Sequence, residues 1–329
     1  MRRVRPELWP AEPGKLVTRY LVTGADGFVG THLVARLRSD GHEVFGTSLA
    51  GGEDLLSCDV RDAAAVAAAV RSSAPERVVH LAAQSSAARS WKEPALTYEV
   101  NVTGTHHLLE AVRRQVPGAR VLVACTSDQY GAVAPTECPI EEQAPLRPLS
   151  PYAASKVAAE CVAQMFWHAF ALEVVITRAF MHVGPGQPAT FATADWARQI
   201  ALAESGQKEP VLEVGNLDLA REYGDVRDVV AAYVAALECG EPGEPYNVAT
   251  GDARPLREVV TILTRLAHLP LEVRVDAARI RPADPPLLEG SAAKLSRLTG
   301  WSPTRRLEDA LSEVLDHWRK HAGQTTVAR

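Results

Sequence analysis

Short apolar runs alternate with longer amphipathic segments through the first half of the chain. Six runs have the length and β-branched content of strands, at residues 19–24, 42–48, 53–60, 77–83, 119–127 and 172–180. Between them, apolar positions recur with the helical period at residues 28–41, 61–74, 94–116 and 152–171. This alternation predicts right-handed βαβ units on a parallel sheet.

The pattern changes after about residue 180, where glycine, proline and charged residues become frequent. Three further helices are predicted there, at residues 194–206, 256–268 and 306–322. We therefore expect an α/β protein with a Rossmann-type doubly wound parallel sheet over residues 18–180 and a smaller C-terminal α/β lobe over residues 181–322. Residues 221–250 could return to the main sheet, and residues 1–17 and 323–329 are expected to be tails.

Composition excludes several classes of protein. Of the 329 residues, 47% are apolar, which suits a substantial core, and the formal net charge is −5. There is no basic block, so we expect no nucleic-acid partner. There is neither a run of 18 apolar residues nor the apolar stretch of a secretion signal, so we expect no membrane association. The five cysteines are scattered and lack metal-ligand spacing, which predicts no metal site and reduced thiols in the cytoplasm.

A glycine-rich turn joins the first predicted strand to the first predicted helix. The stretch "TGADGFVG" places glycines at positions 24, 27 and 30. Gly24 permits a tight turn, Gly27 lets the backbone approach a pyrophosphate, and Gly30 lets the helix pack closely on the strand. The helix N-terminus then presents unpaired N–H groups to the anion. The turn therefore predicts a dinucleotide site that also includes the remaining residues at its tip and the start of the helix, Asp26, Phe28 and Val29.

The end of the second predicted strand bears on the choice of nicotinamide cofactor. An acidic residue there would bind the ribose 2′-hydroxyl of NAD, but this chain has Thr47 and Ser48. Neither side chain repels a 2′-phosphate, and both hydroxyls could donate to one. We therefore expect NADP(H) to be preferred, with NAD(H) possible.

The stretch "SPYAASKVAAE" carries Tyr152 and Lys156 at helical positions i and i+4, so both side chains share one face. An ammonium beside a phenol, together with the positive ring of an oxidised nicotinamide, would lower the phenol pKa enough for acid–base work. Lys156 could also hold the nicotinamide ribose. The alternative is an incidental surface pair, which the dinucleotide turn upstream disfavours.

Two strand ends should border the same crevice, because ligands of such sheets bind beyond the carboxyl ends of the strands. Thr126 ends the fifth strand and could hydrogen-bond a substrate carbonyl beside Tyr152, or could only cap the strand. Thr126, Tyr152 and Lys156 would then form a catalytic triad for carbonyl reduction or alcohol oxidation. The residues that follow the fourth strand should line the nicotinamide side, namely Leu81, Ala82 and Ala83.

The GxxGxxG spacing and the YxxxK pair resemble the short-chain dehydrogenase/reductase superfamily. The long insert "YGAVAPTECPIEEQAPLRPLSPY" resembles its extended branch, which acts on nucleotide-activated sugars, although it could be an ordinary surface loop. Within that branch the chain resembles the GDP-4-keto-6-deoxy-D-mannose reductases from about residue 18 onward. The segments that carry the resemblance include "HVGPGQ", "VGNLDLARE", "EPYNVATG" and "TGWSP". A GNLD-like segment also occurs in the sibling GDP-mannose 4,6-dehydratases, so that segment indicates only a guanine nucleotide.

The resemblance implies roles for further residues. Arg221 and Arg281 would bind the diphosphate, as the arginine fork suits phosphate oxygens, or each could be a solvated surface arginine. Ser85 would touch the sugar, and Asn216 lies in the nucleotide-sugar segment. His182 and Val183 would border the nicotinamide, although His182 could be a satisfied structural histidine.

The resemblance also assigns an adenine contact. Asp59, beside Val60, matches the aspartate that contacts adenine in the family. It could instead cap the helix that follows.

Two positions depart from the family pattern. Met181 stands where the family usually has an asparagine that positions the substrate, which leaves the exact substrate open. Asp128 follows Thr126 by two residues, where dehydratases carry glutamate as a base. Asp128 could be catalytic or could only order its loop, and we favour the second interpretation.

The expected activity is NAD(P)H-dependent reduction of the 4-keto group of a GDP-linked deoxy-sugar, GDP-4-keto-6-deoxy-D-mannose, to GDP-D-rhamnose. The alternatives are a GDP-mannose 4,6-dehydratase, a 4-epimerase, or an inactive dinucleotide-binding regulator. The resemblance also implies a homodimer that pairs the helix at residues 94–116 and the helix from Tyr152 into a four-helix bundle. Val157, Cys161 and Met165 could serve that interface or the core of the chain itself.

Overall fold

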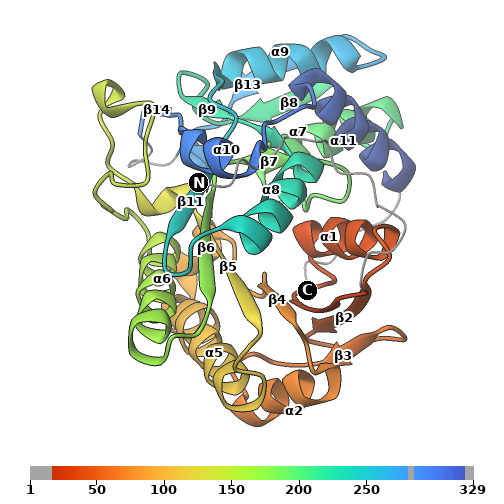
Figure 1. The fold of residues 1–329 in the computed structure, drawn as a ribbon. Coiled ribbons are helices and arrows are strands. Elements are labelled where there is room, and N and C mark those ends of the chain that lie inside the picture. Colours follow the sequence, from red (N-terminus) through yellow and green to blue (C-terminus); the bar gives the residue numbers. More distant parts are fainter. Residues whose placement is uncertain (1–16, 281–284, 323–329) are drawn as a thin grey trace.

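A seven-stranded sheet forms the centre of the computed structural model, which describes residues 17–280 and 285–322 (Figure 1). The strand order is β11-β6-β5-β4-β1-β2-β3, and every neighbouring pair is parallel. The strands are β1 (Arg19–Thr23), β2 (Glu43–Ser48), β3 (Leu55–Ser57), β4 (Arg77–His80), β5 (Arg120–Thr126), β6 (Val174–Ala179) and β11 (Pro245–Val248). The predicted doubly wound parallel sheet is confirmed.

Helices cover both faces of this sheet. One face carries α2 (Ala63–Ser73), α5 (Gly104–Gln115) and α6 (Pro151–Phe170), and the other carries α1 (Phe28–Ser39) and α8 (Val226–Cys239). The strands are apolar on both faces, which is why they appear in the sequence as continuous runs rather than alternating ones.

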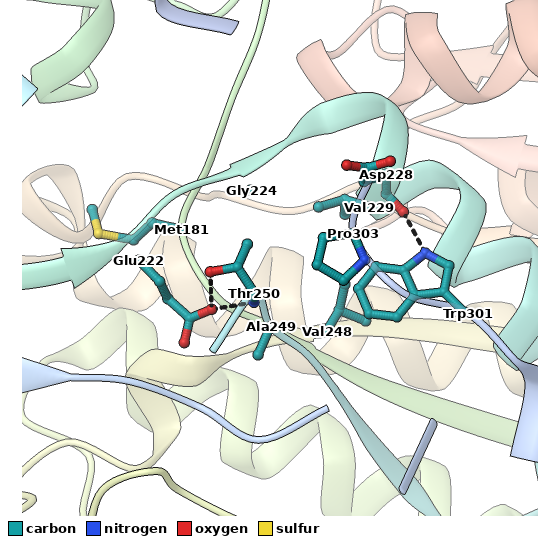
Figure 2. Close-up of a pocket in the computed structure, with 10 residues that line it drawn as sticks. All are labelled: Met181, Glu222, Gly224, Asp228, Val229, Val248, Ala249, Thr250, Trp301 and Pro303. Atoms are coloured by element: carbon teal, nitrogen blue, oxygen red, sulfur yellow. Dashed lines mark hydrogen bonds between the residues drawn. The ribbon is translucent and has the colours of Figure 1, made fainter. Parts of the chain in front are cut away.

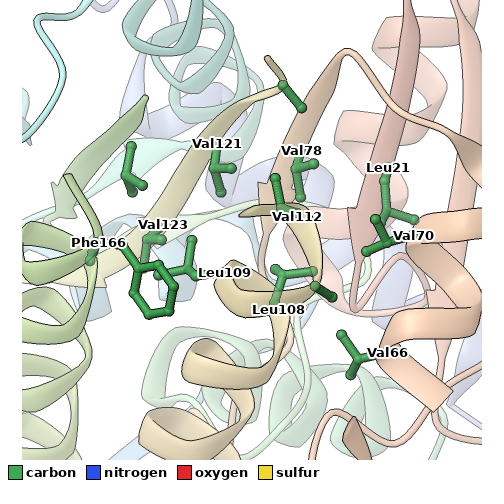
Figure 3. Packing of buried hydrophobic residues seen from close by; sticks show 14 of the residues in the cluster. Leu21, Val66, Val70, Val78, Leu108, Leu109, Val112, Val121, Val123 and Phe166 are labelled. Atoms are coloured by element: carbon green, nitrogen blue, oxygen red, sulfur yellow. The ribbon is translucent and has the colours of Figure 1, made fainter. Parts of the chain in front are cut away.

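The strand β1 illustrates this double burial. Leu21 points into the cluster under α2 and α5, drawn in Figure 3, whereas Tyr20 and Val22 point into the cluster under α1 and α8. Burial of each large aliphatic side chain contributes roughly 1.5–3 kcal/mol. The packing therefore fixes the strand ends, from which the candidate site is built.

A second lobe lies beyond the carboxyl ends of the central strands (Figure 1). The helices α7 (Ala192–Glu204), α9 (Leu256–Leu266) and α11 (Leu307–His321) pack together over β8 (Val211–Val214) around a separate apolar cluster. All three helices predicted for this region are present. Its short elements are β7 (His182–Val183), β9 (Ala220–Glu222), β10 (Gly224–Asp225), β12 (Ala253–Pro255), β13 (Glu272–Val275), β14 (Leu287–Leu288) and α10 (Ala293–Thr299).

The region of residues 221–250 contributes to both parts of the molecule. The helix α8 packs against α1, and β11 pairs in parallel with β6 at the edge of the central sheet. The strands β9 and β10 instead pair outside that sheet, with β12 and β14 and with β7. The division into two domains after residue 180 stays a prediction.

The structure differs from the predicted elements in several places. The predicted strand at 53–60 is reduced to β3, and a short helix, α3 (Ala87–Lys92), was not predicted. The predicted helix at 94–116 is divided into α4 (Pro94–Tyr98), a π-helical turn (Glu99–Thr103) and α5. A π turn inserts one residue into the helical register, and apolar periodicity does not reveal such an insertion.

Candidate active site

The candidate site lies where the order of the strands reverses beside β1. From β1 the chain proceeds to β2 and β3 on one side, whereas β4 lies on the other side. The loops after β1 and β4 therefore diverge and leave a crevice at their carboxyl ends. The ends of β5 and β6 border the same edge, so four separate segments contribute to one site.

The glycine turn after β1 is shaped by close backbone approaches. Gly24 has a φ of +68°, and a Cβ there would lie 2.9 Å from the backbone nitrogen of Ala82. A Cβ on Gly30 would lie 2.1 Å from the carbonyl oxygen of Gly24. Both positions therefore require glycine.

The start of α1 suits an anionic group. The helix begins after Gly27, and no side chain caps its first turn. The N–H groups of that turn are therefore not occupied by a capping side chain, and the helix dipole favours negative charge there. Asp26 is exposed, whereas Phe28 and Val29 are half-buried. The residues present fit a dinucleotide diphosphate.

A residue at the start of α1 and a residue of β7 meet across the crevice. The ring of Phe28 stacks on the ring of His182, with centroids 5.9 Å apart and an angle of 11°. His182 Nδ1 also lies 3.0 Å from the carbonyl oxygen of Phe180, and burial lowers the pKa of the imidazole. His182 is thus hydrogen-bonded as a structural histidine would be, and it also lies against a residue of the dinucleotide turn. Val183 is fully buried in the cluster of the second lobe.

The two hydroxyl residues that end β2 are buried. Thr47 is 1% exposed and Ser48 is 3% exposed. Ser48 Oγ accepts a hydrogen bond from the backbone N–H of Gly51 at 2.9 Å, so it holds the turn that follows the strand. Both residues therefore lie below the surface of the protein.

Asp59 forms a local ion pair and does not cap a helix. Its carboxylate accepts hydrogen bonds from the guanidinium of Arg61, one of them at 2.6 Å, and this bonding lowers the pKa of the Asp59 carboxyl. The cap of α2 is Asp62, whose carboxylate accepts from two backbone N–H groups. The alternative that Asp59 caps this helix is therefore wrong. Its neighbour Val60 is buried.

The helix α6 begins as its sequence indicates. Ser150 Oγ accepts a hydrogen bond from the N–H of Ala153 at 3.1 Å, and Pro151 occupies the first turn. This start places Tyr152 in the first turn and Lys156 one turn later. Tyr152 is half-buried, and its phenol lies close enough to the Thr126 hydroxyl for that hydroxyl to affect the phenol pKa.

The phenol pKa does not follow the expectation from the sequence. Burial and then the charge of Asp128 raise the pKa of Tyr152, whereas the hydrogen bond from Thr126 lowers it. Lys156 is buried, and its Nζ donates to the carbonyl oxygen of Ala124 at 2.8 Å, which directs the ammonium to the end of β5. Burial lowers the pKa of Lys156 itself. Lys156 is not among the groups that shift the phenol pKa, so the lowering expected from the lysine is not found.

Hydrogen bonds anchor the loop that follows β4. Leu81, Ala82 and Ala83 are half-buried along the crevice, and Ser85 is exposed. Between them, the buried Gln84 donates its N–H to Asn101 Oδ1 at 2.8 Å. Asn101, in the π turn, in turn donates to Ser155 Oγ on α6 at 2.8 Å, so this loop and the tyrosine helix are joined.

Met181 lies at the edge of a small pocket lined by the start of α8, the end of β11 and the segment after α10 (Figure 2). Its side chain is 38% exposed, and its neighbours in the lining include Glu222, Thr250 and Trp301. The carboxylate of Glu222 in this lining accepts hydrogen bonds from Thr250 and Gly251. A thioether at position 181 therefore adds an apolar contact to this edge of the site.

The residues expected to bind the nucleotide diphosphate lie in the second lobe. Arg221, in β9, is only 6% exposed, and its Nη1 donates to the carbonyl oxygen of Ala220 at 2.8 Å. The alternative of a solvated surface arginine is thus wrong for Arg221. Asn216 is half-buried, and its Oδ1 accepts from the N–H of Asp218. Arg281 lies outside the described residues.

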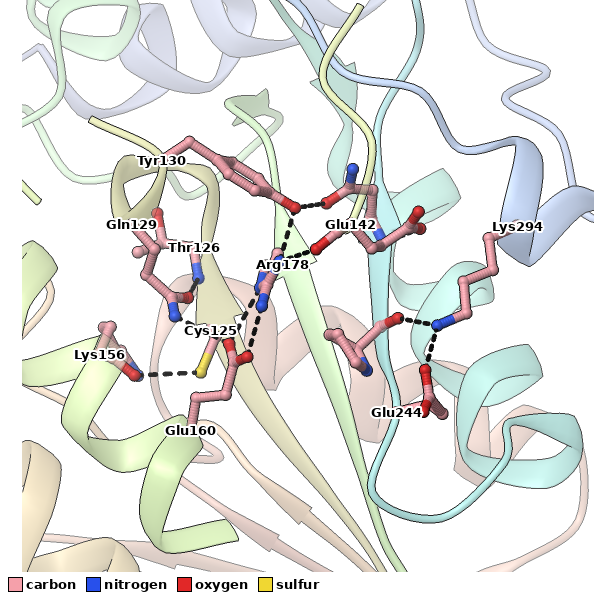
Figure 4. A network of polar contacts seen from close by, with 12 residues as sticks. Cys125, Thr126, Gln129, Tyr130, Glu142, Lys156, Glu160, Arg178, Glu244 and Lys294 are labelled. Atoms are coloured by element: carbon pink, nitrogen blue, oxygen red, sulfur yellow. Dashed lines mark hydrogen bonds and ion pairs between the residues drawn. The ribbon is translucent and has the colours of Figure 1, made fainter. Parts of the chain in front are cut away.

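Sequence reasoning missed a buried polar network behind the triad (Figure 4). Glu160 on α6 and Arg178 on β6 form an ion pair whose side chains are 3% and 5% exposed. Gln129, in the turn after Thr126, donates to Glu160 Oε2 at 2.8 Å. The available signal was an acidic residue four positions after Lys156 in an otherwise apolar helix, because such a residue needs a buried partner.

Within residues 17–280 and 285–322, no cluster of three or more His, Cys, Asp and Glu side chains is arranged to hold a metal ion. The helices described there are also too short or too polar to cross a membrane.

Comparisons of the sequence and of the structure with known proteins agree with each other. A family model described as GDP-mannose 4,6 dehydratase matches residues 21–314. The GDP-6-deoxy-D-mannose reductase of Pseudomonas aeruginosa is 35% identical over 303 residues, with 92% of this chain and 98% of the relative covered. The structure of RMD from Pseudomonas aeruginosa complexed with NADPH superposes with a TM-score of 0.85 at 33% identity, covering 93% of this chain and 100% of that one.

A second solved structure extends the comparison to epimerases. The Thermus thermophilus UDP-glucose 4-epimerase in complex with NAD superposes with a TM-score of 0.82 at 33% identity, covering 92% of this chain and 99% of that one. The matched structures share the central parallel sheet and its flanking helices. The chain therefore belongs to the GDP-mannose 4,6-dehydratase family of extended short-chain dehydrogenases/reductases, and it is an NAD(P)-dependent oxidoreductase of that type.

Proposed function

We propose that this enzyme reduces the 4-keto group of GDP-4-keto-6-deoxy-D-mannose and gives GDP-D-rhamnose. The observation that carries the proposal is the full-length similarity to a GDP-6-deoxy-D-mannose reductase. The meeting of Thr126 with Tyr152 beside a dinucleotide turn supports it, because a ketone reductase needs a proton donor at that place. The NADPH in the related RMD structure favours NADP(H) as the cofactor, with NAD(H) possible.

The cofactor would be held by the turn after β1 and by the residues around it. The N–H groups of the first turn of α1 would bind the pyrophosphate, and the Phe28–His182 pair would border the nicotinamide end. When bound, the reduced nicotinamide supplies the hydride that reaches C4. Lys156, which its bond to Ala124 directs toward the site, would hold the nicotinamide ribose.

Tyr152 would complete the reduction as the proton donor. Because burial raises the pKa of the phenol, Tyr152 is protonated at neutral pH and holds the proton that the developing alkoxide at C4 requires. The Thr126 hydroxyl would hydrogen-bond the same oxygen and fix its position. Arg221, Arg281, Asn216 and Ser85 would bind the nucleotide diphosphate and the sugar, so that binding energy aligns C4 with the donor groups.

The test measures cofactor turnover with two substrates. The purified protein is incubated with GDP-4-keto-6-deoxy-D-mannose and NADPH, and in parallel with GDP-mannose and catalytic NADP⁺. We expect one equivalent of NADPH to be oxidised per equivalent of ketone and no reaction of GDP-mannose. A 4-keto product formed from GDP-mannose without net change of cofactor would replace the proposal with a dehydratase.

The second candidate is GDP-mannose 4,6-dehydration, and one observation favours it. Asp128 lies close enough to Tyr152 for its charge to raise the phenol pKa, so a carboxylate is available near the reacting carbon. Such a base could remove a proton from C5. The two-substrate assay separates this candidate from the reductase, and an epimerase would show interconversion of sugars with no net cofactor change.

We also propose that two copies of the chain associate through α4, α5 and α6. The outer surface of these helices carries apolar side chains, with Tyr98 40%, Met165 41% and Phe170 48% exposed. Cys161 is exposed on the same helix, so the alternative that Cys161 and Met165 fill the core of the chain is wrong. A four-helix bundle would cover this surface. The substitution Met165→Glu should shift the mass measured by light scattering from that of two chains toward that of one, and an unchanged mass would contradict this interface.

A further inference from the structure

Three active-site groups lie on one face of α6. Tyr152, Lys156 and Glu160 are spaced by four residues, so their side chains follow one stripe along the helix. The first two point to the proposed reaction centre, whereas Glu160 is buried two turns from Tyr152. Because the three residues share one helix, the contacts that fix Glu160 also help to fix Tyr152 and Lys156.

Glu160 is fixed by groups from two other elements. Its Oε2 accepts hydrogen bonds from Arg178 Nε at 3.0 Å and from Gln129 Nε2 at 2.8 Å, and its Oε1 accepts from Arg178 Nη2 at 2.5 Å. Arg178 is in turn fixed by Nη1, which donates to Tyr130 Oη at 2.9 Å and to the carbonyl oxygen of Glu142 at 2.8 Å. The carboxylate thus has little freedom to move.

Gln129 uses both ends of its amide. Its Nε2 donates to Glu160, and its Oε1 accepts the backbone N–H of Thr126 at 3.1 Å (Figure 4). The side chain is fully buried. One amide therefore connects the helix that carries Tyr152 to the strand end that carries Thr126, on the side away from the substrate.

We propose that Gln129 is a positioning residue that sets the Thr126 hydroxyl against the Tyr152 phenol by joining the backbone of Thr126 to the Glu160–Arg178 ion pair. This inference rests on the proposed function, because it concerns the proton donor of that reaction. Gln129 is fully buried, so it has no surface for direct contact with substrate or cofactor. It acts through the geometry of the two groups that do.

The first test compares Gln129→Met with Tyr130→Phe. Methionine keeps the length and volume of the glutamine and removes both hydrogen bonds, whereas Tyr130→Phe removes the bonds to Arg178 and Asn247 on the other side of the same network. With NADPH and the ketone, we expect Gln129→Met to lower kcat roughly 10- to 100-fold with KM nearly unchanged, because a displacement of about 1 Å has effects of this size. Tyr130→Phe should lower the melting temperature and leave kcat within about twofold of the parent.

The second test is rescue by Gln129→Glu. The introduced carboxyl lies against Glu160, so its pKa should be raised, and its protonated form can donate to Glu160 and accept from Thr126 as the amide does. We expect nearly full kcat near pH 6 and a loss toward pH 9 that the parent lacks. The other ionisable groups around Glu160 and Tyr152 are Arg178, Lys156, Cys125, Asp128 and Tyr233, and all are common to the parent and the variant.

The outcomes are decisive in each direction. The proposal is overturned if Gln129→Met keeps the parent kcat, or if Tyr130→Phe loses as much kcat as Gln129→Met. If Gln129→Met does not fold, the pH-dependent loss in Gln129→Glu decides, and a flat profile overturns the proposal.

A readout that needs no turnover separates this inference from the proposed function. If the parent enzyme does not reduce the ketone, the proposed function fails, and crystal structures of Gln129→Met and Tyr130→Phe still measure the Thr126–Tyr152 distance. A longer distance in Gln129→Met alone supports the positioning role, and an unchanged distance refutes it.

Discussion

Two of the three glycines of the dinucleotide turn should respond differently to the same added methyl group. A Cβ on Gly30 would lie 2.1 Å from the Gly24 carbonyl oxygen and 2.8 Å from Ala25 Cα, both of them backbone atoms. Since carbon contacts relax only at about 3.5 Å, α1 and β1 must separate by more than about 1 Å. Overpacking of this kind costs roughly 1–3 kcal/mol, so Gly30→Ala should lower the melting temperature by roughly 1–5 °C.

Gly27→Ala should separate cofactor binding from stability. The backbone of Gly27 has a φ of −72°, which any residue adopts, and the one close neighbour of an added Cβ is the Gly24 carbonyl oxygen at 3.1 Å. The fold should therefore lose less than about 1 kcal/mol, and the loss of a flexible glycine from the unfolded chain offsets part of it. The methyl group would instead stand where the pyrophosphate approaches. We expect NADPH to bind roughly 10- to 100-fold more weakly, equivalent to about 1.4–2.7 kcal/mol.

The assay pairs thermal unfolding with titration of NADPH fluorescence at a temperature where each variant is folded. Gly118→Ala is the matched control, because an added Cβ there has no neighbour within 4 Å, and it should change neither quantity. The reasoning is refuted if Gly27→Ala melts as early as Gly30→Ala while it binds NADPH like the parent.

Four further predictions concern the phenol, its neighbours and the ion pair behind them. Tyr152→Phe should lower kcat roughly 10²- to 10⁴-fold with NADPH affinity retained, as measured by steady-state kinetics and fluorescence titration. A fully active variant would show that Tyr152 is not the proton donor. Burial and Asp128 raise the phenol pKa. Because ketone reduction needs the protonated phenol, its rate should be constant from about pH 6 to 9. Because alcohol oxidation needs the phenolate, its rate should rise with pH. Asp128→Asn removes a charge that raises this pKa, so the rise in oxidation should move to lower pH, and a shift to higher pH would contradict the electrostatic account. Glu160→Gln should cost about 3–5 kcal/mol in the free energy of unfolding by urea, because it leaves the buried Arg178 guanidinium without its anion, and the double variant Glu160→Leu with Arg178→Met should recover most of that loss. Equal stability of the single and double variants would show that the buried charge is not the cause.

Local features of the candidate site were predictable from the sequence. The glycines at positions 24, 27 and 30 act within one turn, and the phenol and ammonium share one helical face, so spacing alone indicates what each can do. The parallel arrangement of the central strands follows from the alternation of strands and helices, because such βαβ units have right-handed connections. These features depend on interactions between residues close in the sequence.

The tertiary structure decided the remaining features, which depend on groups far apart in the sequence. Burial reversed the expected direction of the Tyr152 pKa, because desolvation depends on what packs around the phenol and not on its neighbours along the chain. Gln129, Glu160 and Arg178 come from a turn, a helix and a strand, and a hydrogen-bond network among them forms only once the sheet is assembled. The sequence therefore determined the reacting groups, and the assembled sheet determined their environment and their alignment, since electrostatics and hydrogen bonds act through space.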